Sequence, residues 1–383
     1  MIYPLTHNSW NKSEIQAIKN VIKSGMYSMS NNVKRFEKQL ANFFNAKDAV
    51  MVNSGSSANL LIFALLKYKY NLKGDVLVPV VGWSTSYFPI HQNGFRLVFV
   101  DINPNTFNID DNLIEKNITK NTCAILAINI LGNTCNFKNI NKIAKKHNLI
   151  LIEDNCESFG AISNNKKLAG TNGLMGSLSF FFSHHLQTME GGAILCKKKS
   201  DATYLRSLRA HGWRRDDESF FDIKNPIKKF KNSFKFYTPG YNLRPLEMSG
   251  AIGSVQLKKW NHFHSMRLQN AQLFKEIFGQ NKNIIIQKEL GVSSWFGFGF
   301  ILQGKLKGKR DIIIKKFYTN QIECRPIVTG NFLKNPVIKL LNHKKSGKFI
   351  NADNLHNNGL FLGNHSKNLS KQIQLAYKLI SEI

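Results

Sequence analysis

The chain has 383 residues, a net charge of +29 and 43% hydrophobic residues. This length allows a sizeable core, as one large α/β unit with a smaller one or as two to three ordinary domains, and excludes a mini-protein. The excess of positive charge would suit an anionic ligand or nucleic acid. Because lysine and asparagine are scattered through nearly every segment, we interpret the charge as a solvated surface. A basic nucleic-acid-binding or regulatory protein stays the non-enzyme alternative.

The beginning of the chain and its cysteines indicate the compartment. Met1 to His7 lack the basic, apolar and small-residue regions of an export signal. No apolar run approaches the roughly 18 residues that span a bilayer. The five cysteines are odd in number and include no Cys-x-x-Cys pair. We therefore expect a cytoplasmic protein with structural thiols, no metal site and no membrane contact.

The first two thirds of the chain alternate between helical and strand-like patterns. Apolar residues at helical spacing predict two amphipathic helices, around residues 15–22 and 33–43, and a third at about residues 57–69. The alternation that follows favours a mostly parallel sheet covered on both faces. The expected strands are 76–81, 96–100, 124–130, 149–153, 178–182 and 193–196, with a helix over 139–147.

The pattern changes near residue 250. A long helix is expected after Ser249, and the strict alternation from Trp295 to Ile301 predicts a half-buried strand. We therefore predict two domains. A large α/β domain over residues 1–248 would bind any cofactor, and a smaller α+β domain would occupy residues 249–383.

Three segments at strand ends carry candidate chemistry. The turn Asn53-Ser-Gly-Ser-Ser-Ala-Asn59 directly precedes an apolar helix, where N–H groups and hydroxyls could hold a phosphate, although a plain helix cap is the alternative. The strand ending at Asp154 places a carboxylate where it could pair with a cationic ring nitrogen, although solvated acids are common there. A third apolar strand leads to Ser183-His184-His185 and then to the turn Glu190-Gly-Gly192.

In this order the three segments resemble the sugar aminotransferase family of fold-type I pyridoxal-phosphate (PLP) enzymes, the DegT/DnrJ/EryC1/StrS group. The resemblance runs over nearly the whole chain and implies that family's fold. The motifs that carry it are Gly55-Ser-Ser, Pro79-x-x-x-Trp83, Val100-Asp101, Leu131-Gly-Asn133, Glu153-Asp154, Glu190-Gly-Gly192, Gly240-Tyr-Asn-x-Arg244 and Arg325-Pro326.

One departure from the family changes the expected mechanism. His184 stands where the family's aminotransferases carry the lysine that binds the cofactor covalently, and no lysine occurs from Gly170 to Leu195. A histidine can instead move a proton near pH 7, because its unperturbed pKa is about 6.5. The pattern Ser-His-His…Thr-Met-Glu-Gly-Gly resembles the lysine-free branch of the family, the nucleotide-sugar 3-dehydratases.

This branch implies pyridoxamine 5′-phosphate (PMP) as the working cofactor, regenerated from PLP with L-glutamate. The implied substrate is a nucleotide-linked 4-keto-6-deoxyhexose that loses its C3 hydroxyl, in deoxysugar and surface-polysaccharide (O-antigen) biosynthesis. The alternative enzyme is a PLP- or PMP-dependent 4-keto-sugar aminotransferase that works without the usual lysine. An iron–sulfur dehydratase is disfavoured because the cysteines lie too far apart in sequence for a cluster, and an inactive relative is disfavoured because the other motifs persist.

The resemblance also implies the roles of individual residues. His184 would be the general base and Asp154 the partner of the ring nitrogen, with Trp83 stacked on the ring and Glu157 near its hydroxyl. The implied phosphate ligands are Gly55, Ser56, Ser57 and Ser183, together with Asn242, which would reach the neighbouring subunit of a homodimer. The candidate substrate contacts are His185, Arg209, His211 and Arg325, with a structural hydrogen bond as the alternative role of His185.

Overall fold

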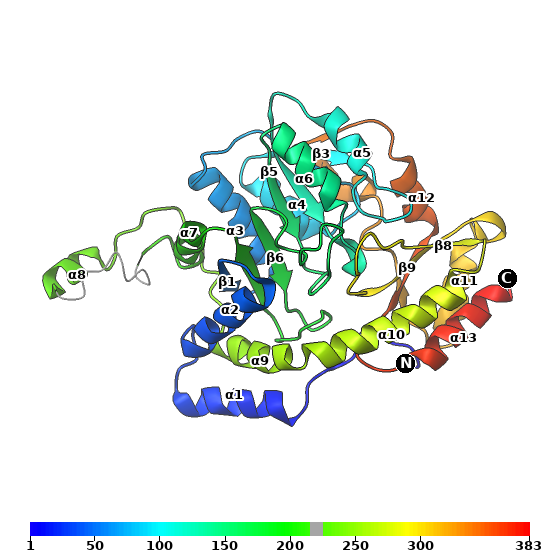
Figure 1. The fold of residues 1–383 in the computed structure, drawn as a ribbon, viewed down its shortest axis with the longest axis horizontal. Coiled ribbons are helices and arrows are strands. Elements are labelled where there is room, and N and C mark those ends of the chain that lie inside the picture. Colours follow the sequence, from blue (N-terminus) through cyan, green and yellow to red (C-terminus); the bar gives the residue numbers. More distant parts are fainter. Residues whose placement is uncertain (215–224) are drawn as a thin grey trace.

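The computed structural model describes residues 1–214 and 225–383, and within them a large mixed sheet forms the centre of the molecule (Figure 1). Its strand order is β1-β7-β6-β5-β4-β2-β3-β11. The pairs from β6 to β11 are parallel, whereas β7 runs antiparallel to both of its neighbours. In sheet order the strands are Asp48–Val52, Gly192–Cys196, Met175–Ser179, Ile150–Asp154, Thr122–Ile128, Asp75–Pro79, Arg96–Val100 and His343–Lys345.

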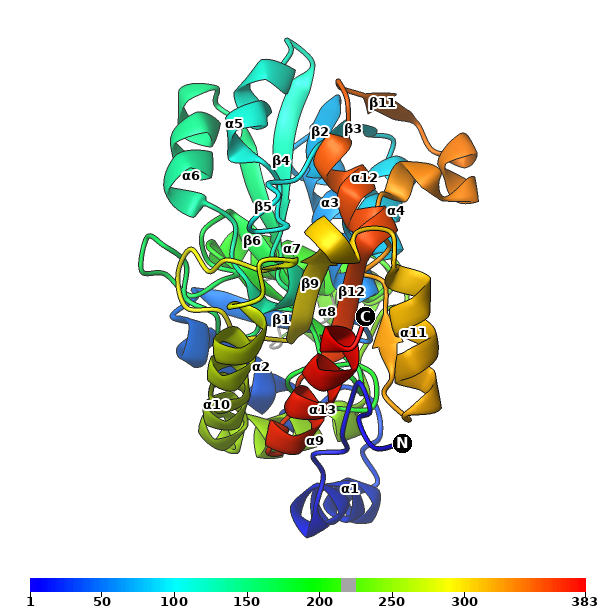
Figure 2. The same cartoon turned by 90° about the vertical axis from the view of Figure 1, so that its right-hand side faces the viewer.

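Helices cover both faces of this sheet because its strands are apolar on both sides (Figure 2). Along β2, for example, Val76 and Val78 pack with one core and Leu77 with the other. One face is covered by α3 (Gly55–Tyr68), α4 (Ser84–Gln92), α7 (Lys199–Arg209) and α12 (Ile350–Asn358). The other is covered by α2 (Asn31–Phe44), α5 (Asp111–Ile114), α6 (Phe137–Lys146) and the start of α10 (Trp260–Phe278). The predicted α/β fold is confirmed.

A second, antiparallel sheet of order β10-β12-β9-β8 has its own core. The strands are β8 (Ile284–Ile286), β9 (Gly297–Leu302), β10 (Cys324–Arg325) and β12 (Gly359–Gly363). They pack against α10, α11 (Arg310–Thr319) and α13 (Ser370–Ser381). Tyr3, from the start of the chain, lies in this core, and β11 returns to the large sheet. A domain division at residue 248 stays a prediction.

The structure corrects three expected elements. The long helix after Ser249 is two helices, α9 (Glu247–Lys258) and α10. The strand expected at 178–182 is β6 at Met175–Ser179, which pairs with β5 from Met175 onward. The strand β9 is buried on both faces rather than half-buried, because its glycines admit close neighbours: a Cβ on Gly297 would lie 1.7 Å from the ring of Phe361.

One surface segment is strongly apolar. The short helix α8 (Pro226–Asn232) projects away from the rest of the molecule (Figure 1). Around it the large apolar side chains of Ile227, Phe230 and Phe234 are exposed, Phe230 to 82%.

None of the helices in the described residues has the length and apolar character that a membrane crossing requires.

Candidate active site

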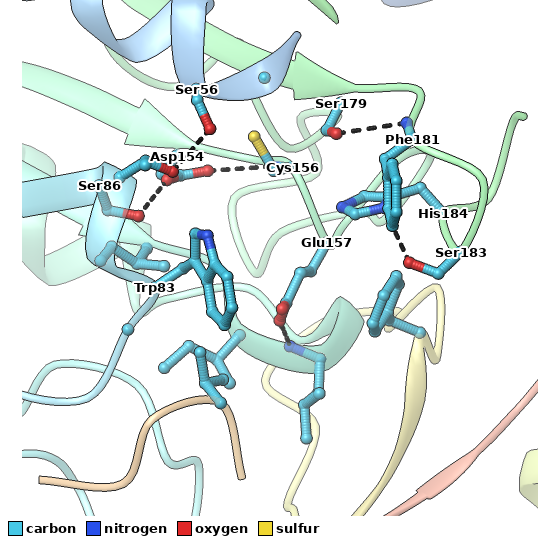
Figure 3. A pocket seen from close by; sticks show the side chains of 18 of the residues that line it. Ser56, Trp83, Ser86, Asp154, Cys156, Glu157, Ser179, Phe181, Ser183 and His184 are labelled. Atoms are coloured by element: carbon cyan, nitrogen blue, oxygen red, sulfur yellow. Dashed lines mark hydrogen bonds between the residues drawn. The ribbon is translucent and has the colours of Figure 1, made fainter. Parts of the chain in front are cut away.

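A pocket of about 600 Å³ opens at the carboxyl ends of the parallel strands (Figure 3). The loops that follow β2, β4, β5 and β6 line it, together with the N-terminus of α3 and side chains from the second sheet, Phe296, Arg325 and Phe361. Ligands of open α/β sheets bind at this edge of the sheet, because successive strand ends and helix N-termini converge there. None of the described residues that line the pocket is a lysine.

The N-terminus of α3 forms one wall of the pocket. Ser54 caps the helix, accepting a hydrogen bond from the Ser57 backbone N–H at 3.1 Å. The exposed Ser56 hydroxyl lies 2.7 Å from that of Thr85. A Cβ on Gly55 would lie 2.6 Å from the Cβ of Ser179, so only glycine allows this close approach. Free N–H groups and hydroxyls at a helix N-terminus are the donors that a phosphate group requires.

Asp154 lies at the floor of the pocket, at the end of β5. Its Oδ2 accepts hydrogen bonds from the Ser86 hydroxyl at 2.6 Å and the Asn59 amide at 2.8 Å. Its Oδ1 accepts from the backbone N–H of Cys156 at 3.1 Å. These donors hold the buried carboxylate in one orientation, and it could pair with a cationic ring nitrogen in the pocket.

Trp83 and Glu157 face the same space (Figure 3). Trp83 precedes α4, and its indole is 57% exposed, which suits a stacking surface for a planar ligand. Glu157 accepts a hydrogen bond from the Leu131 backbone N–H at 2.9 Å. Burial, opposed by that hydrogen bond and assisted by the charge of Asp154, raises the pKa of Glu157 to about 7. With the α3 terminus and Asp154, these groups fit a phosphorylated aromatic ring that contains a cationic nitrogen.

His184 lies in the loop between β6 and β7, half-buried at the pocket wall. Its Nδ1 is 3.4 Å from the Ser183 hydroxyl, and its ring packs edge-on against Phe296 at 5.2 Å. Burial lowers the pKa of His184 to about 4; the negative charge of Asp154 opposes this and the positive charge of Arg267 assists it. The imidazole is therefore neutral at pH 7 and has a free lone pair for a proton.

The structure brings most of the predicted site residues together. The pocket is lined by Gly55, Ser56, Trp83, Asp154, Glu157, Ser183, His184 and Arg325. Ser57 is buried at the helix cap instead, where its hydroxyl lies 3.0 Å from that of Ser54.

Two predicted substrate contacts point away from the pocket. His185 is buried behind it, and its Nε2 donates to the Ser294 carbonyl oxygen at 3.1 Å. Arg209 is buried in an ion pair with Glu37 at 2.7 Å. The expected substrate contacts of His185 and Arg209 therefore find no support in the structure, and His185 has the structural hydrogen bond that was its alternative role.

His211 and Asn242 also lie outside this pocket. They belong to the segment after α7 that leads to and from α8, where the backbone N–H of His211 donates to the Tyr241 carbonyl oxygen at 2.8 Å. The side chain of Asn242 accepts from Arg244 Nε at 3.0 Å. Their expected roles in the site stay predictions.

Several pocket residues were not predicted. Ser86 and Thr85 follow Trp83 on α4, a helix that the sequence analysis did not propose, and Asn59 was quoted only as the end of a turn. Phe296 reaches the pocket from the second sheet. Polar residues directly after the Pro79-x-x-x-Trp83 motif were the available signal for Thr85 and Ser86; nothing local indicates Phe296.

Known proteins resemble this chain over almost its full length. The sequence model of the DegT/DnrJ/EryC1/StrS aminotransferase family matches residues 8–378 of this chain. GDP-4-keto-6-deoxy-D-mannose 3-dehydratase of Yersinia pseudotuberculosis is 46% identical, over 99% of this chain and 98% of its own. A solved GDP-4-keto-6-deoxymannose-3-dehydratase with a trapped PLP–glutamate adduct superposes with a TM-score of 0.94 at 45% identity, covering 99% of this chain and all of its own. A mutant with bound GDP-perosamine gives the same TM-score, identity and coverage.

Proposed function

The chain belongs to the DegT/DnrJ/EryC1/StrS aminotransferase family, and we propose that within it the chain is a PMP-dependent 3-dehydratase acting on a GDP-linked 4-keto-6-deoxyhexose. The observation that carries this proposal is His184, which lines a lysine-free pocket where aminotransferases of the family have their lysine. The Ser183-His184-His185 and Glu190-Gly-Gly192 motifs resemble those of GDP-4-keto-6-deoxymannose 3-dehydratase, and the 46% identity of the chain to that enzyme supports the same function. The product would serve deoxysugar and surface-polysaccharide biosynthesis.

The residues of the pocket divide the work of this reaction. Bound PMP would supply an amine that condenses with the sugar ketone and a ring that accepts electrons. The α3 N-terminus with Ser56 would hold its phosphate, and Asp154 would hold the ring nitrogen in its cationic form. Trp83 would cover one ring face. His184, which is neutral, would accept the proton from the cofactor's C4′ carbon as the C3 hydroxyl leaves.

Arg325 is the candidate for an anionic group of the substrate. It lines the pocket with a side chain that is largely exposed, and its only ion pair among the described residues is a 3.3 Å contact with Glu323. A guanidinium binds diphosphate or carboxylate oxygens bidentately. The relatives with bound GDP-perosamine and a PLP–glutamate adduct support a GDP-sugar and L-glutamate as its ligands.

A homodimer with a shared active site is part of the proposal, as is a cytoplasmic location. Two observations support the dimer: apolar side chains around α8 are exposed on a projecting segment, and His211 and Asn242 lie outside their own pocket. Co-expression of H184N with N242A tests it. Mixed dimers should regain activity that neither variant has alone, since one of their two sites is intact; no recovery in mixed dimers would contradict a shared site.

The function is tested with purified enzyme, PMP, L-glutamate and GDP-, CDP-, UDP- and dTDP-linked 4-keto-6-deoxysugars, with products read by mass spectrometry. A 3-deoxy-4-keto product from the GDP sugar, with release of ammonia, is expected. An amino sugar as the main product would favour the aminotransferase alternative. Protein that takes up no vitamin B6 cofactor would favour the basic binding protein.

A further inference from the structure

Arg267, on α10, is a buried cation that the proposed reaction does not use. The residue is 4% exposed, and burial lowers the pKa of its guanidinium to about 9. No carboxylate of the described residues forms an ion pair with it. A buried charge is costly unless its surroundings stabilise it. Its contacts therefore indicate what its charge does.

Those contacts are backbone carbonyl groups behind the active site. Nη1 of Arg267 donates to the carbonyl oxygens of Trp295 at 3.3 Å, Phe296 at 3.2 Å and Asn364 at 2.5 Å. The Asn364 amide closes the arrangement by donating to the carbonyl oxygens of Trp295 at 2.9 Å and of Arg267 at 3.2 Å. Arg267 thus holds the segment 294–296 in place from the side opposite the pocket.

The same segment forms the surface on which the catalytic loop rests. The Phe296 ring lies 5.2 Å from the His184 ring and 5.7 Å from the His185 ring. Ser294 accepts the hydrogen bond from His185. The backbone N–H of Phe296 donates to the Leu131 carbonyl oxygen at 3.0 Å. Phe296 therefore contacts both residues: its carbonyl oxygen accepts from Arg267, and its ring packs against the imidazole of His184.

The charge of Arg267 also reaches the imidazoles around it. Burial and then this positive charge lower the pKa values of His185, His264 and His365, and they act in the same direction on His184. The other charged or titratable groups that line the pocket with His184 are Asp154, Cys156, Glu157, Glu190 and Arg325. Of these, Asp154 opposes the effect of Arg267 on His184.

We propose that Arg267 is a positioning residue for His184: its guanidinium fixes the backbone that carries Phe296, whose ring packs against the imidazole, and its unpaired positive charge disfavours a second positive charge on that imidazole. The effect of Arg267 on catalysis rests on the proposed dehydratase function. The packing of Phe296 on His184 and the effect of the Arg267 charge on the imidazole can be tested without that reaction.

The test reads the protonation of His184 directly, in the full-length protein before PMP is added. Diethyl pyrocarbonate modifies neutral imidazoles, so its rate at His184, followed by peptide mass mapping between pH 3.5 and 7.5, gives the protonation midpoint. R267Q removes the charge but keeps amide donors for the carbonyl groups. It should raise the midpoint measurably, because a positive charge that opposes protonation of the imidazole is removed.

R267K keeps the charge and should leave the midpoint at its wild-type value. R310Q is the matched control, because Arg310 on α11 also donates to a backbone carbonyl group, that of His356, away from the pocket. An unchanged midpoint in R267Q with a native melting curve, or an equal shift in R267K, would overturn the proposal. Should R267Q fail to fold, R267K decides alone, and a raised midpoint in it overturns the proposal.

The catalytic readout is separate from the protonation readout. In R267Q the acid limb of the pH profile of kcat/KM for dehydration should move upward with the midpoint, which a merely structural role would not cause. Absence of dehydration in the wild-type protein would reject the proposed function and leave the protonation test in force.

Discussion

In E157Q, where the neighbouring carboxyl with a pKa of about 7 no longer titrates, lowering the pH from 7 to 5 should leave the dehydration rate almost unchanged. Burial lowers the pKa of His184 to about 4, so about nine tenths of the imidazole is still neutral at pH 5. With the unperturbed pKa of about 6.5, only about 3% would be neutral at pH 5, and the rate would fall about 25-fold from its value at pH 7. The sign follows from the base role, because protonation removes the lone pair that His184 needs.

The assay is single-turnover dehydration of the GDP sugar by PMP-loaded enzyme in a buffer series of constant ionic strength. Far-ultraviolet circular dichroism at each pH confirms that the protein stays folded. H147N is a control for a histidine outside the site, since His147 pairs with Glu115 at the surface. An acid limb with a midpoint near 6.5 would refute the assignment of the neutral, desolvated base to His184.

Four further predictions concern single substitutions. H184N should still take up PMP but lose about 10²–10⁴-fold in turnover; near-normal dehydration would transfer the base role to another group. D154N should lower turnover by orders of magnitude while the fold survives, because the ring nitrogen loses its anionic partner; full activity would place Asp154 away from the ring. G55A should weaken PMP binding measured by fluorescence and destabilise the fold by about 1–3 kcal/mol, since its Cβ would lie 2.6 Å from Ser179. Borohydride reduction should attach cofactor to a lysine in H184K but not in the wild-type protein, as read by peptide mass mapping.

Local sequence patterns were sufficient for the central strands of the large sheet and for much of the pocket, but not for the edge strands β1 and β11. Apolar runs and helical spacing repeat over a few residues, so they identified the strands from β2 to β5 and some of the covering helices, among them α2, α3 and α6. Because parallel strands end at one edge of the sheet, motifs from Gly55 to His184 were expected to meet, and the structure brings them together. The substitution of histidine for lysine at position 184 was visible from the motif alone.

Contacts with residues far away in the sequence decided which of the predicted site residues face the pocket. His184 and His185 are adjacent and alike in sequence, yet the first lines the pocket and the second donates to Ser294, which is 109 positions away. Arg209 belongs to a motif of the dehydratase branch, yet its charge is paired with Glu37, 172 positions away. Burial and ion pairing depend on which side chains the tertiary fold brings within a few ångströms, and no local pattern encodes that. For the same reason Arg267, an ordinary residue of an amphipathic helix in the sequence, becomes the buried cation behind the catalytic loop only in the folded chain.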